Sequence, residues 1–125
     1  MNDDPALIFA SLRAVLEQQR GPLVVSADTP SRYTMVGTKP SPFPQHKGAP
    51  MWFGEVKIGK AYVSLHLLPL YMNPPLLKKV PPGLKKRMQG KACFNFKAAP
   101  RPELLAELQQ LVEAAIKDWT AKQLL

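Results

Sequence analysis

Two segments in which apolar and polar residues alternate constrain the fold of this chain most strongly. They span residues 52–58 and 61–67 and are separated only by Gly59 and Lys60. A two-residue loop that begins with glycine is typical of a type II′ turn in a β-hairpin. The sequence therefore predicts that these segments pair as antiparallel strands around that turn.

The predicted turn also fixes which side chains share a face of the hairpin, because it places Ile58 opposite Ala61 and Val56 opposite Val63. One face then carries Trp52, Gly54, Val56, Ile58, Ala61, Val63, Leu65 and Leu67, all apolar or small. The other carries Phe53, Glu55, Lys57, Tyr62, Ser64 and His66, with Phe53 across from His66. A slip of one residue would reverse both faces, so the agreement between the strands supports this pairing.

Amphipathic helices are expected near both ends of the chain. Asp4 and Pro5 suit the start of a helix that ends near Gln19. A second helix follows Pro102 and has one broad apolar face, formed by Leu104, Leu105, Leu108, Leu111, Val112, Ala115, Ile116 and Trp119. Such a face must cover something, and the apolar side of the hairpin is the expected target.

The remaining segments complete an α+β prediction. Strands are expected at 23–27, 32–37 and 92–97 and a short helix at 83–89, while the proline-rich stretches 38–50 and 69–82 are expected to be loops. The predicted fold is one domain over residues 1–125. It has a single antiparallel sheet of about five strands, with the N- and C-terminal helices packed on one face.

The composition favours a cytosolic protein without a metal or cofactor. Cys93 is the single cysteine, so no disulfide can form within the chain, and one cysteine with two histidines does not supply the usual zinc ligand sets. The first residues carry acids where a signal peptide would carry positive charge. No apolar run approaches the roughly 18 residues of a membrane span.

Positive charge is concentrated in one part of the chain. The net charge is +8, and residues 57–102 contain ten Lys and Arg but no Asp or Glu. A field of one sign attracts phosphates, nucleic acid or other anions. The candidate anion-binding residues are Lys78, Lys79, Lys85, Lys86, Arg87 and Lys91. The alternative is a solubilising surface, because cations also suit a helix end and their stems cover apolar neighbours.

The polar side of the hairpin is the second candidate site. Its predicted ligand-binding residues, with two from the neighbouring strand, are Glu55, Lys57, Tyr62, Ser64, His66, Asn95 and Lys97. Phe53 and His66 are expected to form a flat platform beside Lys57, to which a small anionic ligand would bind. The alternative is an ordinary solvated face.

Catalytic chemistry is less favoured by the sequence. Glu55 and His66 share a face and could form an acid–base pair, and Cys93 could act as a nucleophile if Lys97 lowered its pKa. No nucleophile motif or metal-ligand set accompanies them. No catalytic residue is therefore predicted.

Three segments resemble the YdhG-like family of small bacterial domains of unknown function. They are Ala61–Leu67 (AYVSLHL), Leu84–Lys91 (LKKRMQGK) and Cys93–Lys97 (CFNFK), within a similarity that covers roughly residues 50–120. The resemblance implies a frataxin-like α+β arrangement, and one branch of the family is regarded as an iron chaperone. This chain departs from that role because iron delivery relies on exposed carboxylates, which residues 57–102 lack.

These observations together predict a non-catalytic binding module for an anionic small molecule or an acidic partner. Weak, sequence-independent binding of nucleic acid through residues 78–91 is the first alternative. An iron chaperone is the second, implied only by the resemblance. No membrane partner is expected, and the sequence leaves the oligomeric state open.

Overall fold

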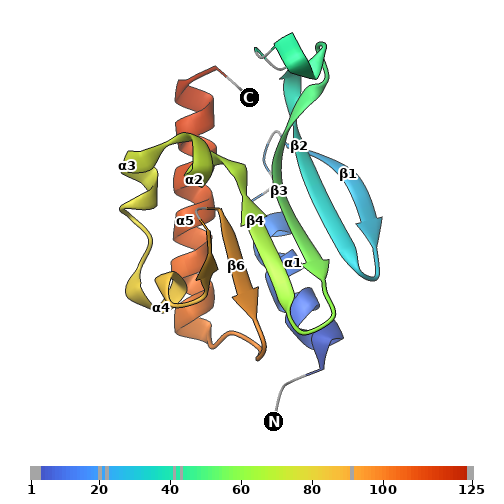
Figure 1. Ribbon diagram of the computed structural model, residues 1–125, viewed down its shortest axis with the longest axis vertical. Helices are drawn as coiled ribbons and strands as arrows, with labels where there is room; N and C mark the ends of the chain where they lie inside the picture. The colour runs from blue at the N-terminus through green and yellow to red at the C-terminus, as the bar shows by residue number, and fades with distance from the viewer. Residues whose placement is uncertain are drawn as a thin grey trace.

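The computed structural model describes residues 4–19, 21, 23–40, 42, 44–90 and 92–123. Its elements are α1 (Pro5–Gln18), β1 (Val24–Thr29), β2 (Arg32–Pro40), η1 (Pro44–His46), β3 (Pro50–Ile58), β4 (Val63–Leu67), α2 (Leu68–Met72), α3 (Pro74–Leu77), α4 (Pro82–Lys85), β5 (Met88–Gln89), β6 (Cys93–Phe96) and α5 (Pro102–Ala121). In the described part of the chain, six strands form one antiparallel sheet in the order β1-β2-β3-β4-β6-β5 (Figure 1). The α+β prediction is confirmed, with six strands instead of about five.

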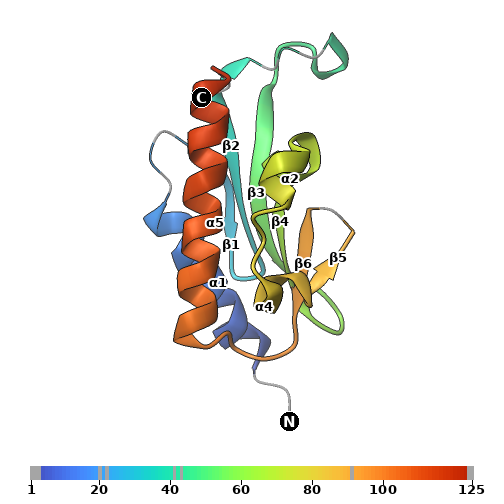
Figure 2. The same cartoon turned by 90° about the vertical axis from the view of Figure 1, so that its left-hand side faces the viewer.

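Helices α1 and α5 cover one face of the sheet, as expected. Figure 2 shows both helices on the same side of the strands, and α1 contacts β3, β4 and α5. The side chain of Asp4 caps α1 by accepting a hydrogen bond from the N–H of Ala6 at 3.0 Å. Fully buried side chains from the sheet and from α5 form the centre of the core: Val56, Val63, Leu65, Leu67, Leu108, Val112, Ala115 and Trp119.

The β3–β4 hairpin forms, but its register differs from the prediction by two residues. Ile58 pairs with Val63 and Val56 with Leu65, so residues 59–62 form a four-residue loop. The N–H of Gly59 donates to the carbonyl of Tyr62 at 2.8 Å, which closes this loop. Because side chains alternate with a period of two, a shift of two residues leaves each face of β4 as predicted. Tyr62, however, lies in the loop and not on the strand.

One prediction for β3 is wrong because of a β-bulge. Met35 pairs with Gly54 and Val36 with Trp52, so Phe53 is an extra residue without a partner on β2. Such an extra residue changes which way the neighbouring side chains point. Phe53 is fully buried and packs edge-on against Trp119, with ring centroids 5.3 Å apart. The half-buried Trp52, not Phe53, lies beside His66.

The proline-rich stretches contain more regular structure than expected. Strand β2 continues to Pro40, which lies opposite Pro50 of β3, so the loop between these strands is shorter than 38–50. The stretch 69–82 contains most of α2 and all of α3. Proline fits the first positions of such short helices, where its missing N–H is not needed.

The helix expected at 83–89 ends early. Helix α4 stops at Lys85, and Met88 and Gln89 form β5, which pairs with β6. The N–H of Asn95 donates to the carbonyl of Arg87 at 2.8 Å, so the backbone after α4 bonds to a strand instead of continuing the helix. Gly90 follows with a φ of 78°, a conformation that favours glycine.

The bulge predicts losses of stability of different size when two neighbouring aromatic residues are each replaced by alanine. Phe53→Ala should lower the free energy of unfolding by about 3–5 kcal/mol, because it empties a fully buried site against Trp119. Trp52→Ala should cost only ~1 kcal/mol, because Trp52 is half-buried on the opposite face. Urea denaturation of both variants measures the difference. A larger loss for Trp52→Ala would contradict the bulge.

Candidate functional site

The sheet face opposite α1 and α5, here called the outer face, carries two rows of polar residues. Cross-strand pairing places Thr34, Glu55, His66 and Cys93 in one row, and Arg32, Lys57, Ser64 and Asn95 in the next. Five of the seven predicted ligand-binding residues are therefore neighbours on this face: Glu55, Lys57, Ser64, His66 and Asn95. Tyr62 and Lys97 lie beyond the ends of the paired strands.

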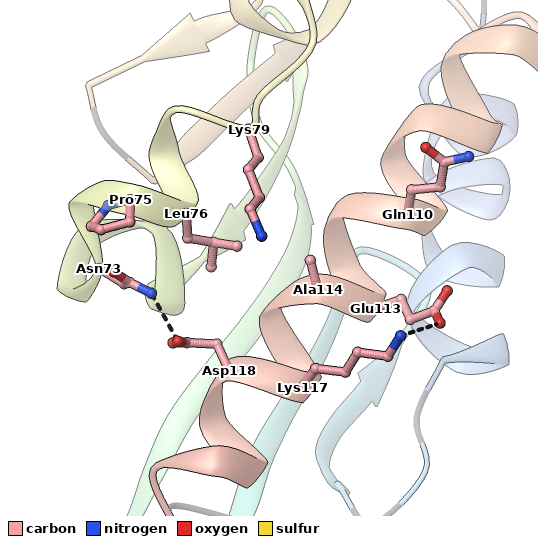
Figure 3. Close-up of a pocket in the computed structure, with 9 residues that line it drawn as sticks. All are labelled: Asn73, Pro75, Leu76, Lys79, Gln110, Glu113, Ala114, Lys117 and Asp118. Atoms are coloured by element: carbon pink, nitrogen blue, oxygen red, sulfur yellow. Dashed lines mark hydrogen bonds and ion pairs between the residues drawn. The ribbon is translucent and has the colours of Figure 1, made fainter.

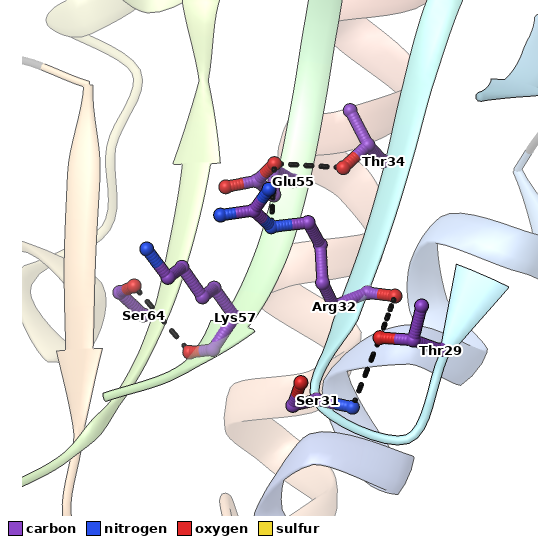
Figure 4. A network of polar contacts seen from close by, with 7 residues as sticks. All are labelled: Thr29, Ser31, Arg32, Thr34, Glu55, Lys57 and Ser64. Atoms are coloured by element: carbon purple, nitrogen blue, oxygen red, sulfur yellow. Dashed lines mark hydrogen bonds and ion pairs between the residues drawn. The ribbon is translucent and has the colours of Figure 1, made fainter. Parts of the chain in front are cut away.

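Glu55 and Ser64 are held by contacts within the protein (Figure 4). The hydroxyl of Thr34 donates to Glu55 Oε2 at 2.7 Å, and Arg32 Nε lies 3.6 Å from the same oxygen. Ser64 is buried, and its hydroxyl lies 3.5 Å from the carbonyl of Lys57. These two residues organise the sheet surface more than they present free groups to a ligand.

Sequence reasoning did not identify Arg32 and Thr34, the two partners of Glu55. Both lie on β2, and their approach to Glu55 depends on the pairing of β2 with β3. That pairing crosses residues 38–50, where the proline-rich sequence gives no periodic pattern. No local signal in the sequence points to this contact.

His66 lies between an aromatic ring and a thiol. Trp52 approaches it at a ring-centroid distance of 5.9 Å and an angle of 60°, and Cys93 Sγ lies 3.6 Å from His66 Nε2. Burial lowers the pKa of His66 below its ordinary value of 6.5, while Glu55 opposes this shift and Lys57 adds to it. The imidazole is therefore mainly neutral at pH 7.

Cys93 is a protonated thiol in this environment. Burial raises its pKa, which is the opposite of the lowering by Lys97 that nucleophilic catalysis would need. The Sγ atom lies within hydrogen-bonding range of Asn95 Oδ1, at 3.5 Å, as well as of His66. A neutral thiol beside a neutral imidazole is a poor starting point for nucleophilic catalysis, because the thiolate is the reactive form.

A groove at one end of the sheet brings the two candidate sets together. It has a volume of about 680 Å³ and is lined by Ala61, Tyr62, Lys86, Arg87, Met88, Gln89, Asn95, Lys97 and Ala98. We call it the basic groove. The β3–β4 loop, α4 and the end of β6 lie in the lower half of the view in Figure 1, and Figure 2 shows β5 beside β6. Among the described residues that line it, none is acidic.

Arg87 is held in a defined position and lines both the basic groove and a neighbouring hollow that contains Glu103 and Glu107. Its NH1 donates to the carbonyl of Gly83 at 2.7 Å, and its Cζ lies 5.9 Å from the centre of the Phe96 ring. A guanidinium has five N–H donors, so this bond leaves most of them for other acceptors. A cation that is already positioned loses less conformational entropy when it binds an anion.

The rest of the basic segment does not share this groove. Lys79 extends into a hollow of about 490 Å³ between α3 and α5 (Figure 3). That hollow also contains Glu113, ion-paired with Lys117 at 3.2 Å, and Asp118, which accepts a hydrogen bond from Asn73 at 2.8 Å. It therefore has mixed charge. Lys78 and Lys85 are exposed and line neither hollow, and Lys91 lies outside the described residues.

Comparisons with family models, curated proteins and solved structures found no match for this chain. The resemblance to the YdhG-like family therefore stays a prediction. Within the described residues, no group of three or more His, Cys, Asp or Glu side chains is placed to hold a metal ion. No helix in the described part of the chain has the length and apolar character to cross a membrane.

The environment of His66 gives its pKa a measurable dependence on two neighbours. An NMR titration of the imidazole should give a value below 6.5, because burial disfavours the charged form. Lys57→Gln should raise this pKa and Glu55→Gln should lower it further, because they remove a repulsive and an attractive charge, respectively. Shifts in the same direction would contradict this arrangement of charges.

The same shift makes stability depend on pH. The unfolded chain takes up a proton on His66 at a higher pH than the folded protein, so the free energy of unfolding should fall as the pH drops below 6.5. Urea denaturation of the wild type and of His66→Gln between about pH 7 and pH 5 tests this directly, and the variant should show a flatter dependence.

The raised pKa of Cys93 predicts that its thiol reacts slowly at neutral pH. At pH 7 its reaction with a soluble aromatic disulfide should be at least about tenfold slower in the folded protein than in urea, where burial is lost. The absorbance of the released thiolate follows the rate. Equal rates in both states would indicate a thiol that the fold does not protect.

Proposed function

We propose that this chain is a non-catalytic binding module for a phosphate-bearing anion, carried by a small molecule or a partner, and that the basic groove is its binding site. The observation that supports this most directly is the composition of the groove. Lys86 and Arg87, which follow α4, and Lys97, which follows β6, converge there, and no described residue among those lining it is acidic.

The chemistry of the groove suits a phosphate group. A guanidinium presents parallel N–H donors to two oxygens of one anion, and lysine ammonium groups add strong point charges. The side chains of Gln89 and Asn95 bring neutral amide groups to the same surface. Together they combine attraction at a distance with hydrogen bonds at contact.

The remaining polar residues of the outer face have a supporting role in this proposal. The carboxylate of Glu55 accepts a hydrogen bond from Thr34 and pairs with Arg32, so its negative charge is compensated within the sheet. Cys93 and Asn95 are in contact along β6, which links the row that contains His66 to the groove. The protonated thiol and neutral imidazole favour binding over catalysis.

Tripolyphosphate is a suitable first probe, because it supplies phosphate oxygens without a ring or sugar. Lys86→Gln and Lys97→Gln should each weaken its binding about fivefold, close to the ~1 kcal/mol of an exposed ion pair. Lys39→Gln is the matched control, because Lys39 is an exposed lysine near the opposite end of β2. Isothermal titration calorimetry gives the affinities. An equal loss in all three variants would indicate attraction to net charge alone.

A further inference from the structure

A second hollow adjoins the basic groove, and Tyr62 forms part of the wall of both. This second hollow has a volume of about 610 Å³ and lies between the β3–β4 loop, the end of β6 and the start of α1. Lys60 lines only the second hollow, whereas Tyr62 and Lys97 line both. The two hollows therefore form a continuous surface at the end of the sheet.

Tyr62 is an exposed aromatic residue whose backbone is fixed. The residue is 39% exposed, and its carbonyl accepts the hydrogen bond that closes the β3–β4 loop. A methyl group added to Gly59 would lie 3.1 Å from the Tyr62 carbonyl and 4.0 Å from Cε2 of its ring. Gly59 thus lies beside the ring of Tyr62, which presents an apolar surface among cations.

Cations lie on both sides of Tyr62. Lys86 and Arg87 are in the basic groove, Lys60 is in the second hollow, and Lys97 borders both. The acid at the far end of the second hollow is Asp4, whose carboxylate caps α1 through the N–H of Ala6. Its negative charge is therefore placed at a helix N-terminus, where it is stabilised within the protein.

A planar ring with positive charge on either side matches the repeating chemistry of a nucleic acid strand. Proteins that bind single strands combine a basic groove along the backbone with aromatic side chains on which bases stack. A paired base in a duplex does not offer its face for such stacking. A single mononucleotide would use the ring and only one of the two sets of cations.

We propose that single-stranded nucleic acid crosses Tyr62, with a base stacked on its ring and phosphates beside Lys86 and Arg87 on one side and Lys60 and Lys97 on the other. This inference rests on the proposed function, because it uses the same basic groove. It adds the nature of the anion and a requirement for an aromatic ring that phosphate alone does not need.

The test uses a fluorescein-labelled decathymidylate and fluorescence anisotropy, with tripolyphosphate measured in parallel. Tyr62→Leu should weaken binding of the oligonucleotide at least about fivefold, because the stacked base loses its partner. The same variant should leave tripolyphosphate binding unchanged, and Tyr62→Phe should retain oligonucleotide binding. Tyr71→Leu is the matched control, because Tyr71 is 65% exposed on α2 and lies outside both hollows.

Salt dependence tests the phosphate contacts separately. Lys60→Gln should reduce the slope of the logarithm of affinity against the logarithm of salt concentration by roughly 0.7, the value for one phosphate contact on a single strand. Lys39→Gln should leave the slope unchanged. Thymidine monophosphate and a ten-base-pair duplex should both bind more weakly than the decathymidylate.

Each other outcome decides between the two proposals. If tripolyphosphate binds and depends on Lys86, but the oligonucleotide is insensitive to Tyr62→Leu, the strand inference is wrong and the proposed function stands. If thymidine monophosphate or the duplex binds as tightly as the single strand, the inference is also wrong. If neither the oligonucleotide nor tripolyphosphate binds, both proposals fail.

Discussion

The packing of α1 and α5 against β3 and β4 determines what every other surface of this protein can present. Val56, Val63 and Leu65 are fully buried beneath these helices. Burying one such side chain contributes roughly 1.5–3 kcal/mol, so the apolar side of the hairpin cannot turn outward without a large loss. Side chains alternate along a strand, and the same constraint therefore fixes Glu55, Lys57 and His66 on the outer face.

The parts of the fold with a strong period could be predicted from the sequence. The apolar stripe of α5 and the alternation along β4 each repeat several times, and they identify the buried apolar residues of both elements, although Ser64 on the polar face of β4 is buried as well. Where a β-bulge interrupts a strand, the period of two no longer predicts which side chains are buried. Phe53 and Trp52 lie on the opposite faces from those predicted, because β3 has one more residue than β2 between two consecutive cross-strand pairs. Neither segment's sequence alone indicates this extra residue.

The candidate site was predictable by residue type but not by arrangement. Tyr62, Asn95 and Lys97 were assigned to a sheet face, and Lys86 and Arg87 to a separate basic segment. They converge because α4 ends early and its following residues form β5 beside β6, which depends on backbone pairing of residues 87–89 with residues 93–95. Lys79 precedes α4 in the chain and lines the hollow against α5 instead. A run of cations in sequence is therefore not one surface in space.

The way Arg87 is held bears on whether the groove is built for a ligand. Cations that share a surface repel one another, and free side chains would turn apart to reduce that repulsion. Arg87, which lines the groove, is instead held by the carbonyl of Gly83 and by the face of Phe96. Two surface charges 4 Å apart in water interact by only about 1 kcal/mol, so the fold can sustain this arrangement. A bound anion would convert the repulsion into attraction, and a ligand at a hundred times its dissociation constant would stabilise the folded state by about 2.7 kcal/mol. Occupancy of the groove would thus raise stability through Arg87, whose carbonyl joins the segment after α4 to β6.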